Sequence, residues 1–356
     1  MNETLRQIID SIQPLPDAPP ETVLTHLDDL TKPPGSLGRL EEFAARFCLI
    51  RGTDAPEMPK KAIFTFAADH GVTEAGVSAY PKEVTRQMVL NMASGGAAIN
   101  VLARHADAEC RVVDVGVDAD FGPVPGVVHR KVRRGTANLA IGPAMSPTEA
   151  EAAIGVGASL ALEAANDGFS LLGTGEMGIG NTTPSAALFA ALLPADPERV
   201  TGRGTGIDDG RLRAKIDVIR LGLNNNRNRL GDPLLALAAV GGLEIAAICG
   251  LILAAASRRI PVIVDGFISS AAALVAFRLQ PNARAYLFFS HLSHEAGHRI
   301  FLDAIGARPM LDLDLRLGEG TGAALAMTLI DAGIRIYREM NTFSGAGVSR
   351  TRAATP

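Results

Sequence analysis

The sequence is poor in cysteine and has little net charge, and both shortages exclude classes of function. The 356 residues carry a formal net charge of −4. Because a nucleic-acid partner needs a basic surface, we do not expect nucleic acid to be the main partner. The cysteines have no motif spacing, which favours buried thiols in a reducing compartment over a redox or metal role. They are Cys48, Cys110 and Cys249.

The first residues also lack the pattern of a secretory signal. Glu3, Arg6 and Asp10 interrupt the apolar positions of residues 1–15, and no charged segment is followed by an apolar run. We therefore expect no signal peptide and a cytoplasmic protein.

One long apolar segment, residues 234–257, raises the question of a membrane span. Its length would cross a bilayer. However, Gly241 and Gly242 divide the segment, and Glu244 places a carboxylate within it. We expect a pair of helices buried in a soluble core, with a membrane span as the alternative.

Short β-branched runs alternate with longer alanine-rich runs through most of the chain. Hydrophobic residues make up 47% and charged residues 20%, which is enough apolar sequence for a sizeable core. Several predicted strands are continuously hydrophobic, as is typical of a parallel sheet with helices on both faces. This order indicates an α/β fold with an open, doubly wound, mostly parallel sheet. The predicted strands are 62–66, 111–115, 169–172, 262–264 and 285–289, and the predicted helices are 146–166, 184–193, 211–221, 243–257, 269–277 and 321–330.

The two ends of the chain show helical patterns without a clear strand. A proline-rich break at residues 14–20 separates the first two helical patterns. Residues 1–30 and 331–356 are therefore predicted to pair into a small helical domain. Residues 31–330 are predicted to form the large α/β catalytic domain.

A glycine-rich loop at residues 173–183 is the most informative candidate site. Its four glycines let a ligand approach the backbone closely, and the helix that follows offers free N–H groups and a positive dipole end. These features predict a phosphate cradle. The loop lacks a Walker A Gly-Lys-Ser/Thr, and no acidic residue ends a strand about twenty residues later, as a dinucleotide fingerprint requires. A tight turn without a ligand is the alternative.

Two further features belong to the same prediction. The glycine-rich turn at residues 201–206 adds hydroxyls, amides and Arg203, and it suits a phosphate or ribose hydroxyls; a plain surface loop is equally compatible. Lys215 could supply a positive charge, with a solvated surface lysine as the alternative. In a doubly wound sheet these loops converge at the carboxyl ends of the strands, together with the loops at 68–71, 265–267 and 290–291.

Glu319 is the candidate for acid–base chemistry. It stands between Gly318 and Gly320, just before an alanine-rich helix. We expect the glycines to give the side chain little cover, so that its carboxylate can act as a general base. The alternative is a glutamate favoured by the dipole at the start of a helix.

The segment from His294 to His298 matches the zinc-protease pattern HExxH. That pattern needs a stable helix with both histidines on one face, and a third ligand. Gly297 weakens a helix here, and the candidate third ligands, Asp312 and Asp314, have no recognised spacing. We expect no metal at this segment.

Six segments in this order resemble the nicotinate-nucleotide:dimethylbenzimidazole phosphoribosyltransferase family. They are residues 32–41, 68–72, 95–100, 175–183, 201–206 and 317–322, and the likeness runs from about residue 30 to Phe343. The combination is far more specific than any single segment. One position departs from the family pattern, since His294 stands where a small residue is expected.

The resemblance implies a homodimer, each subunit having a large Rossmann-like domain and a small helical domain built from both chain ends. It implies transfer of the 5-phosphoribosyl group from nicotinate mononucleotide to 5,6-dimethylbenzimidazole or a related base, which gives nicotinate and the α-ribotide of cobalamin. Glu319 would be the catalytic base, with Glu176 and Lys215 as further active-site residues. The base would bind Ser78, Tyr80, Gln87, Met88 and Leu317. The phosphate and ribose would bind Gly175, Met177, Gly178, Gly180, Asn181, Thr182, Thr201, Gly202, Arg203 and Gly204.

This chemistry fits a site with one general base, no metal and no cofactor. A pyridinium leaving group departs with the bond electrons and needs no general acid, so one carboxylate suffices, in contrast to the carboxylate pair of glycosidases. Two alternatives remain at this point: a nicotinamide-dependent dehydrogenase, and a non-catalytic module that binds a nucleotide or corrinoid intermediate.

Overall fold

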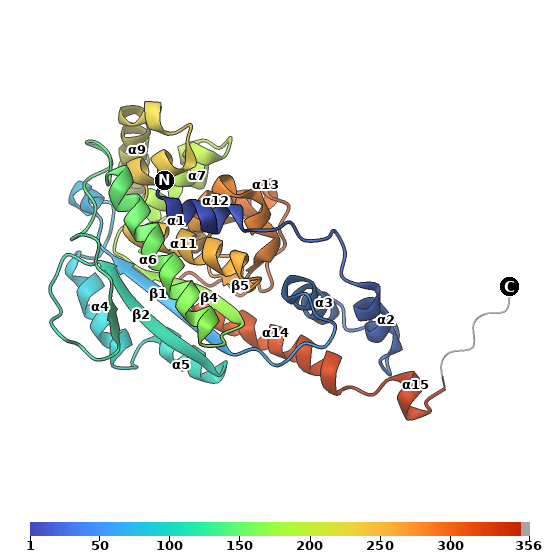
Figure 1. The fold of residues 1–356 in the computed structure, drawn as a ribbon. Helices are drawn as coiled ribbons and strands as arrows, with labels where there is room; N and C mark the ends of the chain where they lie inside the picture. The colour runs from blue at the N-terminus through green and yellow to red at the C-terminus, as the bar shows by residue number, and fades with distance from the viewer. Residues whose placement is uncertain (350–356) are drawn as a thin grey trace.

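Six parallel strands form a single sheet in the order β3-β2-β1-β4-β5-β6 (Figure 1). The structure is a computed structural model that describes residues 1–349. The predicted α/β class with a doubly wound parallel sheet is confirmed, because helices cover both faces. The strands are β1 (Lys61–Ala68), β2 (Ala108–Gly116), β3 (Val127–His129), β4 (Leu171–Met177), β5 (Val262–Val264) and β6 (Leu287–Phe289).

The helices connect the strands and cover the sheet. They are α1 (Glu3–Asp10), α2 (Glu21–Asp29), α3 (Arg39–Arg51), α4 (Glu83–Ala93), α5 (Ala98–His105), α6 (Pro147–Asn166), α7 (Thr182–Leu192), α8 (Pro197–Val200), α9 (Asp209–Asn225), α10 (Pro233–Val240), α11 (Leu243–Ser257), α12 (Phe267–Leu279), α13 (Ala296–Ala304), α14 (Thr321–Glu339) and α15 (Phe343–Ala346). Short 3-10 turns lie at η1 (Gly71–Ala75), η2 (Arg227–Arg229) and η3 (Pro281–Tyr286).

The long apolar segment 234–257 is the helix pair α10 and α11, divided at Gly241 as predicted. Helix α11 is buried along almost its whole length and packs against α6. The two backbones approach so closely that a side chain at Gly157 or Gly250 would overlap the other helix. In the part of the chain that the structure describes, no helix is both long and apolar enough to cross a membrane.

Two of the six strands differ from the prediction. Strand β4 continues to Met177, through Gly173 and Gly175, which the sequence analysis placed in a loop. Glycine interrupts the hydrophobic pattern there, but the backbone still pairs with β1 up to Met177. The three-residue strand β3 was not predicted, and it pairs only with the edge of β2.

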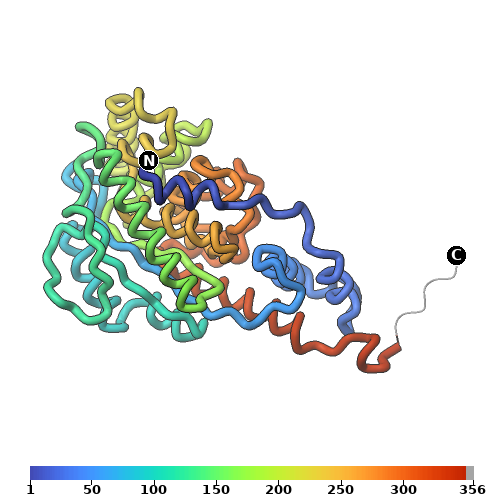
Figure 2. Tube along the Cα trace, in the orientation of Figure 1, coloured from blue at the N-terminus to red at the C-terminus, as the bar shows by residue number. Residues whose placement is uncertain are grey.

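The chain ends divide differently from the prediction. Helix α1 contributes Leu5 and Ile9 to the main core and packs against α11. A separate small apolar cluster joins α2, α3 and the end of α14, away from the sheet (Figure 2). The two-domain division remains a prediction, but these contacts place α1 with the sheet, while α3 contributes to both clusters. Residues 350–356 lie outside the described residues.

Candidate active site

The polar loops meet at the carboxyl ends of the parallel strands. The strand order reverses between β1 and β4, and doubly wound sheets bind ligands in the crevice at such a switch point. Glu176 lies near the end of β4, opposite Phe66 of β1, and Asp265 follows β5 directly. The turn 317–322 reaches the same edge, because the Gly320 N–H donates to Asp265 Oδ2 at 3.3 Å. The predicted convergence of these segments is therefore present.

Glu319 is held in a turn of unusual backbone geometry. Its φ of 64° lies in the left-handed region, between Gly318 at 85° and Gly320 at 100°. The Ile99 N–H donates to Glu319 Oε2 at 3.3 Å, and the Thr65 hydroxyl donates to the Glu319 carbonyl at 2.8 Å. The expectation of little cover is wrong, because the residue is only 4% exposed. Burial raises the pKa of the Glu319 carboxyl, although the Ile99 N–H opposes the shift.

Asp265 supports this turn, a role that sequence reasoning missed. Besides the Gly320 N–H, it accepts the Ala323 N–H at 2.9 Å, so its carboxylate lies at the N-terminus of α14. A carboxylate in this position is favoured by the helix dipole. The side chain is buried, and burial raises its pKa while these N–H groups oppose the shift. The only sequence signal was its place directly after a predicted strand.

Glu176 is buried beside the Glu319 turn. Asn181 Nδ2 donates to Glu176 Oε2. A side chain at Gly318 would overlap Glu176 Oε1, so the glycine is needed for the turn to approach β4. Burial raises the pKa of Glu176 well above its ordinary value, and the nearby carboxylate of Asp265 adds to the shift. This shift favours the uncharged form of Glu176.

Lys215 of α9 connects the two glycine-rich turns. Its ammonium donates to Thr182 Oγ1 at 2.8 Å and to the Gly202 carbonyl at 3.1 Å. The alternative of a solvated surface lysine is wrong, since the residue is 1% exposed. Burial lowers its pKa to about 8. An ammonium has three N–H donors, so one remains for a ligand.

The phosphate cradle predicted at 173–183 is shorter than expected, because its first residues belong to β4. The remaining turn passes through Gly180, at φ 87°, into α7, whose first residues have no side-chain cap. Gly178 packs closely on the Ala68 carbonyl. The backbone N–H groups at the start of such a helix suit an anion.

Two side chains of the second glycine-rich turn that were predicted to bind the phosphate or ribose form hydrogen bonds to residues nearby in the sequence. Arg203 pairs with Asp209 and donates to the Ile207 carbonyl at 2.9 Å. The Thr201 hydroxyl donates to the Pro197 carbonyl at 2.6 Å. The Thr201 hydroxyl proton is therefore used within the protein, whereas the Arg203 guanidinium keeps further N–H donors besides these two bonds.

The segment predicted to bind the base contacts the second glycine-rich turn. Thr205 Oγ1 lies 3.3 Å from Ser78 Oγ and accepts the Ala79 N–H at 2.9 Å. Tyr80 and Leu317 are 57% and 58% exposed, so both apolar side chains are open to contact.

The other two predicted base-binding residues lie on α4. Gln87 is exposed and Met88 is partly buried. Thr85, on the same helix, accepts the Ile179 N–H at 3.1 Å, which ties α4 to the turn after β4. The predicted base-binding residues thus come from three segments: the loop before α4, α4 itself and the turn that contains Leu317.

A buried pair, His70 and Glu244, lies beneath the turn after β4. His70 Nε2 is 2.9 Å from Glu244 Oε1, and both side chains are almost fully buried. Burial alone would lower the pKa of His70, but Glu244 and Asp69 outweigh it and raise the pKa. The Gly178 backbone packs against the imidazole ring. The loop at 68–71 was noted from the sequence, but its partner on α11 was not.

The comparisons with known proteins cover nearly the whole chain. A family model described as phosphoribosyltransferase matches residues 12–348. A nicotinate-nucleotide–dimethylbenzimidazole phosphoribosyltransferase of Chlorobium chlorochromatii is 60% identical over 98% of this chain and 99% of the relative. An enzyme with the same name from Geobacter sulfurreducens is 62% identical over 91% of this chain and 92% of the relative. The crystal structure of CobT from Thermus thermophilus has a TM-score of 0.87 and 50% identity, covering 92% of this chain and 98% of that chain.

The chain belongs to the nicotinate-nucleotide–dimethylbenzimidazole phosphoribosyltransferase family. The predicted family is therefore confirmed, and with it the assignment as a phosphoribosyltransferase. The dehydrogenase and binding-module alternatives are set aside. The roles of individual residues remain predictions.

Within this phosphoribosyltransferase, the two histidines of the HExxH segment do not share a helix face. His294 precedes α13, is exposed, and lies 4.0 Å from Asp314. His298 is buried, with one ring nitrogen 2.9 Å from Ser270 Oγ and the other accepting the Ser293 N–H at 2.8 Å. Burial lowers the pKa of His298 to about 3. Both ring nitrogens of His298 therefore have partners within the protein, on α12 and in the segment before α13.

Proposed function

We propose that this enzyme transfers the 5-phosphoribosyl group from nicotinate mononucleotide to 5,6-dimethylbenzimidazole or a related base. The products are nicotinate and the α-ribotide that forms the nucleotide loop of cobalamin. The names of the relatives support both substrates. The observation that carries the proposal is the buried Glu319 carboxylate, held by its unusual turn at the switch point of the sheet.

Glu319 is the general base in this proposal. The incoming base attacks the anomeric carbon through one ring nitrogen and loses the proton of the other. The electrons of the glycosidic bond leave with the pyridinium nitrogen of nicotinate, so no proton is supplied to the leaving group. A carboxyl with a raised pKa is a stronger proton acceptor once it is ionised.

Lys215 and the two glycine-rich turns hold the phosphate in this proposal. The third N–H of the Lys215 ammonium and the backbone at the start of α7 can donate to the same phosphate. Binding of the phosphate dianion favours the charged form of Lys215. The raised pKa of Glu176 favours its uncharged form, which lowers the negative charge that a phosphate dianion meets in the crevice.

The reaction requires neither a metal nor a cofactor, since positioning and one proton transfer account for its steps. Tyr80 and Leu317, with Ser78, Gln87 and Met88, form the base pocket in this proposal. We also propose that the enzyme is a cytoplasmic homodimer. The exposed apolar side chains of Tyr80 and Leu317 are available to the base or to a second subunit.

The test is to incubate the purified protein with nicotinate mononucleotide and a panel of bases, and to identify the products by mass. We expect release of nicotinate only when a base is present, and a product with the α configuration. A β-configured product would contradict direct displacement. Failure with every benzimidazole, together with activity from another donor, would contradict the proposed substrates.

A further inference from the structure

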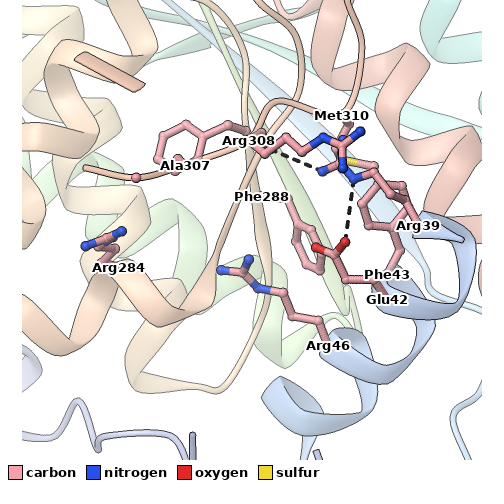
Figure 3. Close-up of a pocket in the computed structure, with 11 residues that line it drawn as sticks. Arg39, Glu42, Phe43, Arg46, Arg284, Phe288, Ala307, Arg308 and Met310 are labelled. Atoms are coloured by element: carbon pink, nitrogen blue, oxygen red, sulfur yellow. Dashed lines mark hydrogen bonds and ion pairs between the residues drawn. The ribbon is translucent and has the colours of Figure 1, made fainter. Parts of the chain in front are cut away.

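A cavity of about 220 Å³ lies at the outer edge of β6, between α3 and the segment 305–310 (Figure 3). It shares no lining residue with the candidate active site. Its lining residues are Arg39, Glu42, Phe43, Arg46, Arg284, Phe288, Phe289, Gly306, Ala307, Arg308 and Met310. Four arginines and a single carboxylate therefore face one small volume.

The two arginines from α3 are partly used by the fold. Arg39 donates to the carbonyls of Arg308 and Pro309, and its guanidinium stacks on Phe43. Arg46 donates to the Leu287 carbonyl at 2.7 Å through Nη2. These bonds attach α3 to the sheet edge and fix the positions of both guanidinium groups.

The other two arginines come from the body of the sheet domain. Arg284 donates through one nitrogen to the Ile305 carbonyl. Among residues 1–349, Arg308 has no hydrogen-bond or ion-pair partner for its guanidinium. A guanidinium carries five N–H donors, so each of these side chains keeps several for a ligand.

The positive charge of the cavity is not balanced by the protein. Glu42 is the only acidic residue in its lining, and its side chain is 55% exposed. Burial lowers the pKa of Arg39, and the charge of Arg308 lowers it further, while Glu42 opposes both. Arg39 and Arg46 are half-buried and Arg284 and Arg308 are exposed, so water screens part of the repulsion among these charges, and a bound anion reduces it further.

The size and geometry of the cavity select the kind of anion. Pockets for drug-sized molecules usually measure roughly 300–1,000 Å³, so this cavity suits a small group. The planar fork of a guanidinium matches the oxygens of a phosphate in a bidentate arrangement. The guanidinium groups of Arg39 and Arg46 lie over the rings of Phe43 and Phe288, at 4.9 and 5.0 Å from the ring centres, and these contacts orient both groups.

We propose that the arginine cavity binds a phosphate group, either inorganic phosphate or the phosphate of a small monoester, separately from the catalytic centre. The phosphate bridges Arg39 and Arg46 of α3 to Arg284 and Arg308 of the sheet domain. It therefore stabilises the attachment of the small helical cluster to the edge of the sheet.

The test uses the double change Arg284→Gln with Arg308→Gln, which leaves Arg39 and Arg46 to hold α3. A control with the same loss of charge is Arg6→Gln with Arg335→Gln, both on exposed helix surfaces. Calorimetry with inorganic phosphate, and separately with nicotinate mononucleotide, is performed at constant ionic strength set by chloride. Lys215→Met identifies binding at the proposed catalytic phosphate site.

We expect the double glutamine variant to weaken one class of phosphate sites by at least about tenfold, while Lys215→Met weakens the other class. The control should bind phosphate as the unaltered protein does. If the arginine-dependent site binds inorganic phosphate, the free ion is a ligand. If the site binds only nicotinate mononucleotide, the ligand is the phosphate of a monoester. Equal phosphate binding by the double variant and the control would overturn the proposal.

Thermal stability gives a second readout that a purely structural role would not produce. Without phosphate, the double variant should melt no lower than the control, because repulsion in the cavity is reduced. Phosphate should then raise the melting temperature of the control but raise that of the double variant much less. If the double variant dissociates an oligomer and its phosphate response is unchanged, the cavity holds an acidic group of a second copy, and the proposal fails.

Discussion

Replacing Gly175 by alanine tests whether the position of Glu319 determines the rate. Gly175 lies in β4, directly against the Glu319 turn. A Cβ at this position would lie 2.7 Å from the Glu319 carbonyl carbon and 2.9 Å from the Gly320 nitrogen. The Glu319 carbonyl oxygen would be closer still, and ordinary contacts of a Cβ begin near 3.4 Å, so the turn and the strand must separate by about 1 Å. Both partners are backbone, so no side chain can rotate away to make room.

The expected effect follows from this displacement. A misplacement of about 1 Å in a catalytic geometry can cost roughly 10²-fold in rate, so we expect turnover to fall by about 10- to 100-fold. Overpacking in a buried strand should also cost about 1–3 kcal/mol of stability. Affinity for nicotinate mononucleotide should change less than turnover, because the proposed phosphate-binding groups lie farther along the chain, at Lys215 and the start of α7.

The assay is steady-state kinetics with nicotinate mononucleotide and dimethylbenzimidazole, combined with donor affinity from calorimetry. The matched control is Gly155→Ala on α6, where an added Cβ meets nothing within 4 Å. That change should leave the rate unaltered and stabilise the helix by about 0.5–1 kcal/mol. Native turnover in a folded Gly175→Ala variant would refute the reasoning that β4 positions the Glu319 turn.

Four other outcomes are expected. Glu319→Gln should slow transfer by roughly 10²–10⁴-fold with donor binding retained; near-native turnover in the folded variant would rule out this general base. The pH profile of kcat/KM should be bell-shaped, rising as Glu319 ionises above its ordinary range and falling as pH passes the Lys215 pKa of about 8; Lys215→Arg should move only the falling limb upward. His70→Leu leaves Glu244 buried without its partner and should cost about 3–5 kcal/mol, which denaturant titration measures, and Glu244→Leu added to it should recover much of the loss. The pKa of His70 is higher in the folded protein than its ordinary value. The stability that protonated His70 contributes is therefore full below about pH 6.5, and it should fade as the pH rises through the raised pKa. Tyr80→Ala should change preference among bases by about 1–3 kcal/mol, and equal losses for all bases would make Tyr80 merely structural.

The strands and helices of the sheet domain were predictable because their hydrophobic patterns are strong. Strand β1 is fully buried and reads as a continuous apolar run. Strand β4 was cut short because Gly173 and Gly175 carry no hydrophobic side chain, although the approach of the Glu319 turn requires glycine at position 175. Strand β3 has only three residues and is partly exposed, so it leaves no periodic signal.

The candidate site was predictable in part. The glycine-rich turns and Glu319 were found because special backbone geometry needs glycine, which is visible in a sequence. The burial of Lys215 was not visible, since it depends on contacts with turns 13 and 33 residues away. Asp265 was also missed as a support for Glu319, because its partners lie more than 50 residues along the chain. Tertiary contacts of this kind have no local pattern.

The two glutamates of the crevice differ in their surroundings, and the difference bears on their proposed roles. Glu176 is surrounded by other carboxylates and accepts a hydrogen bond from Asn181, and its pKa rises well above the ordinary range. Burial also raises the pKa of Glu319, but the Ile99 N–H opposes that shift. In the proposed mechanism, the Ile99 N–H stabilises the ionised form of Glu319, and this supports Glu319 over Glu176 as the base.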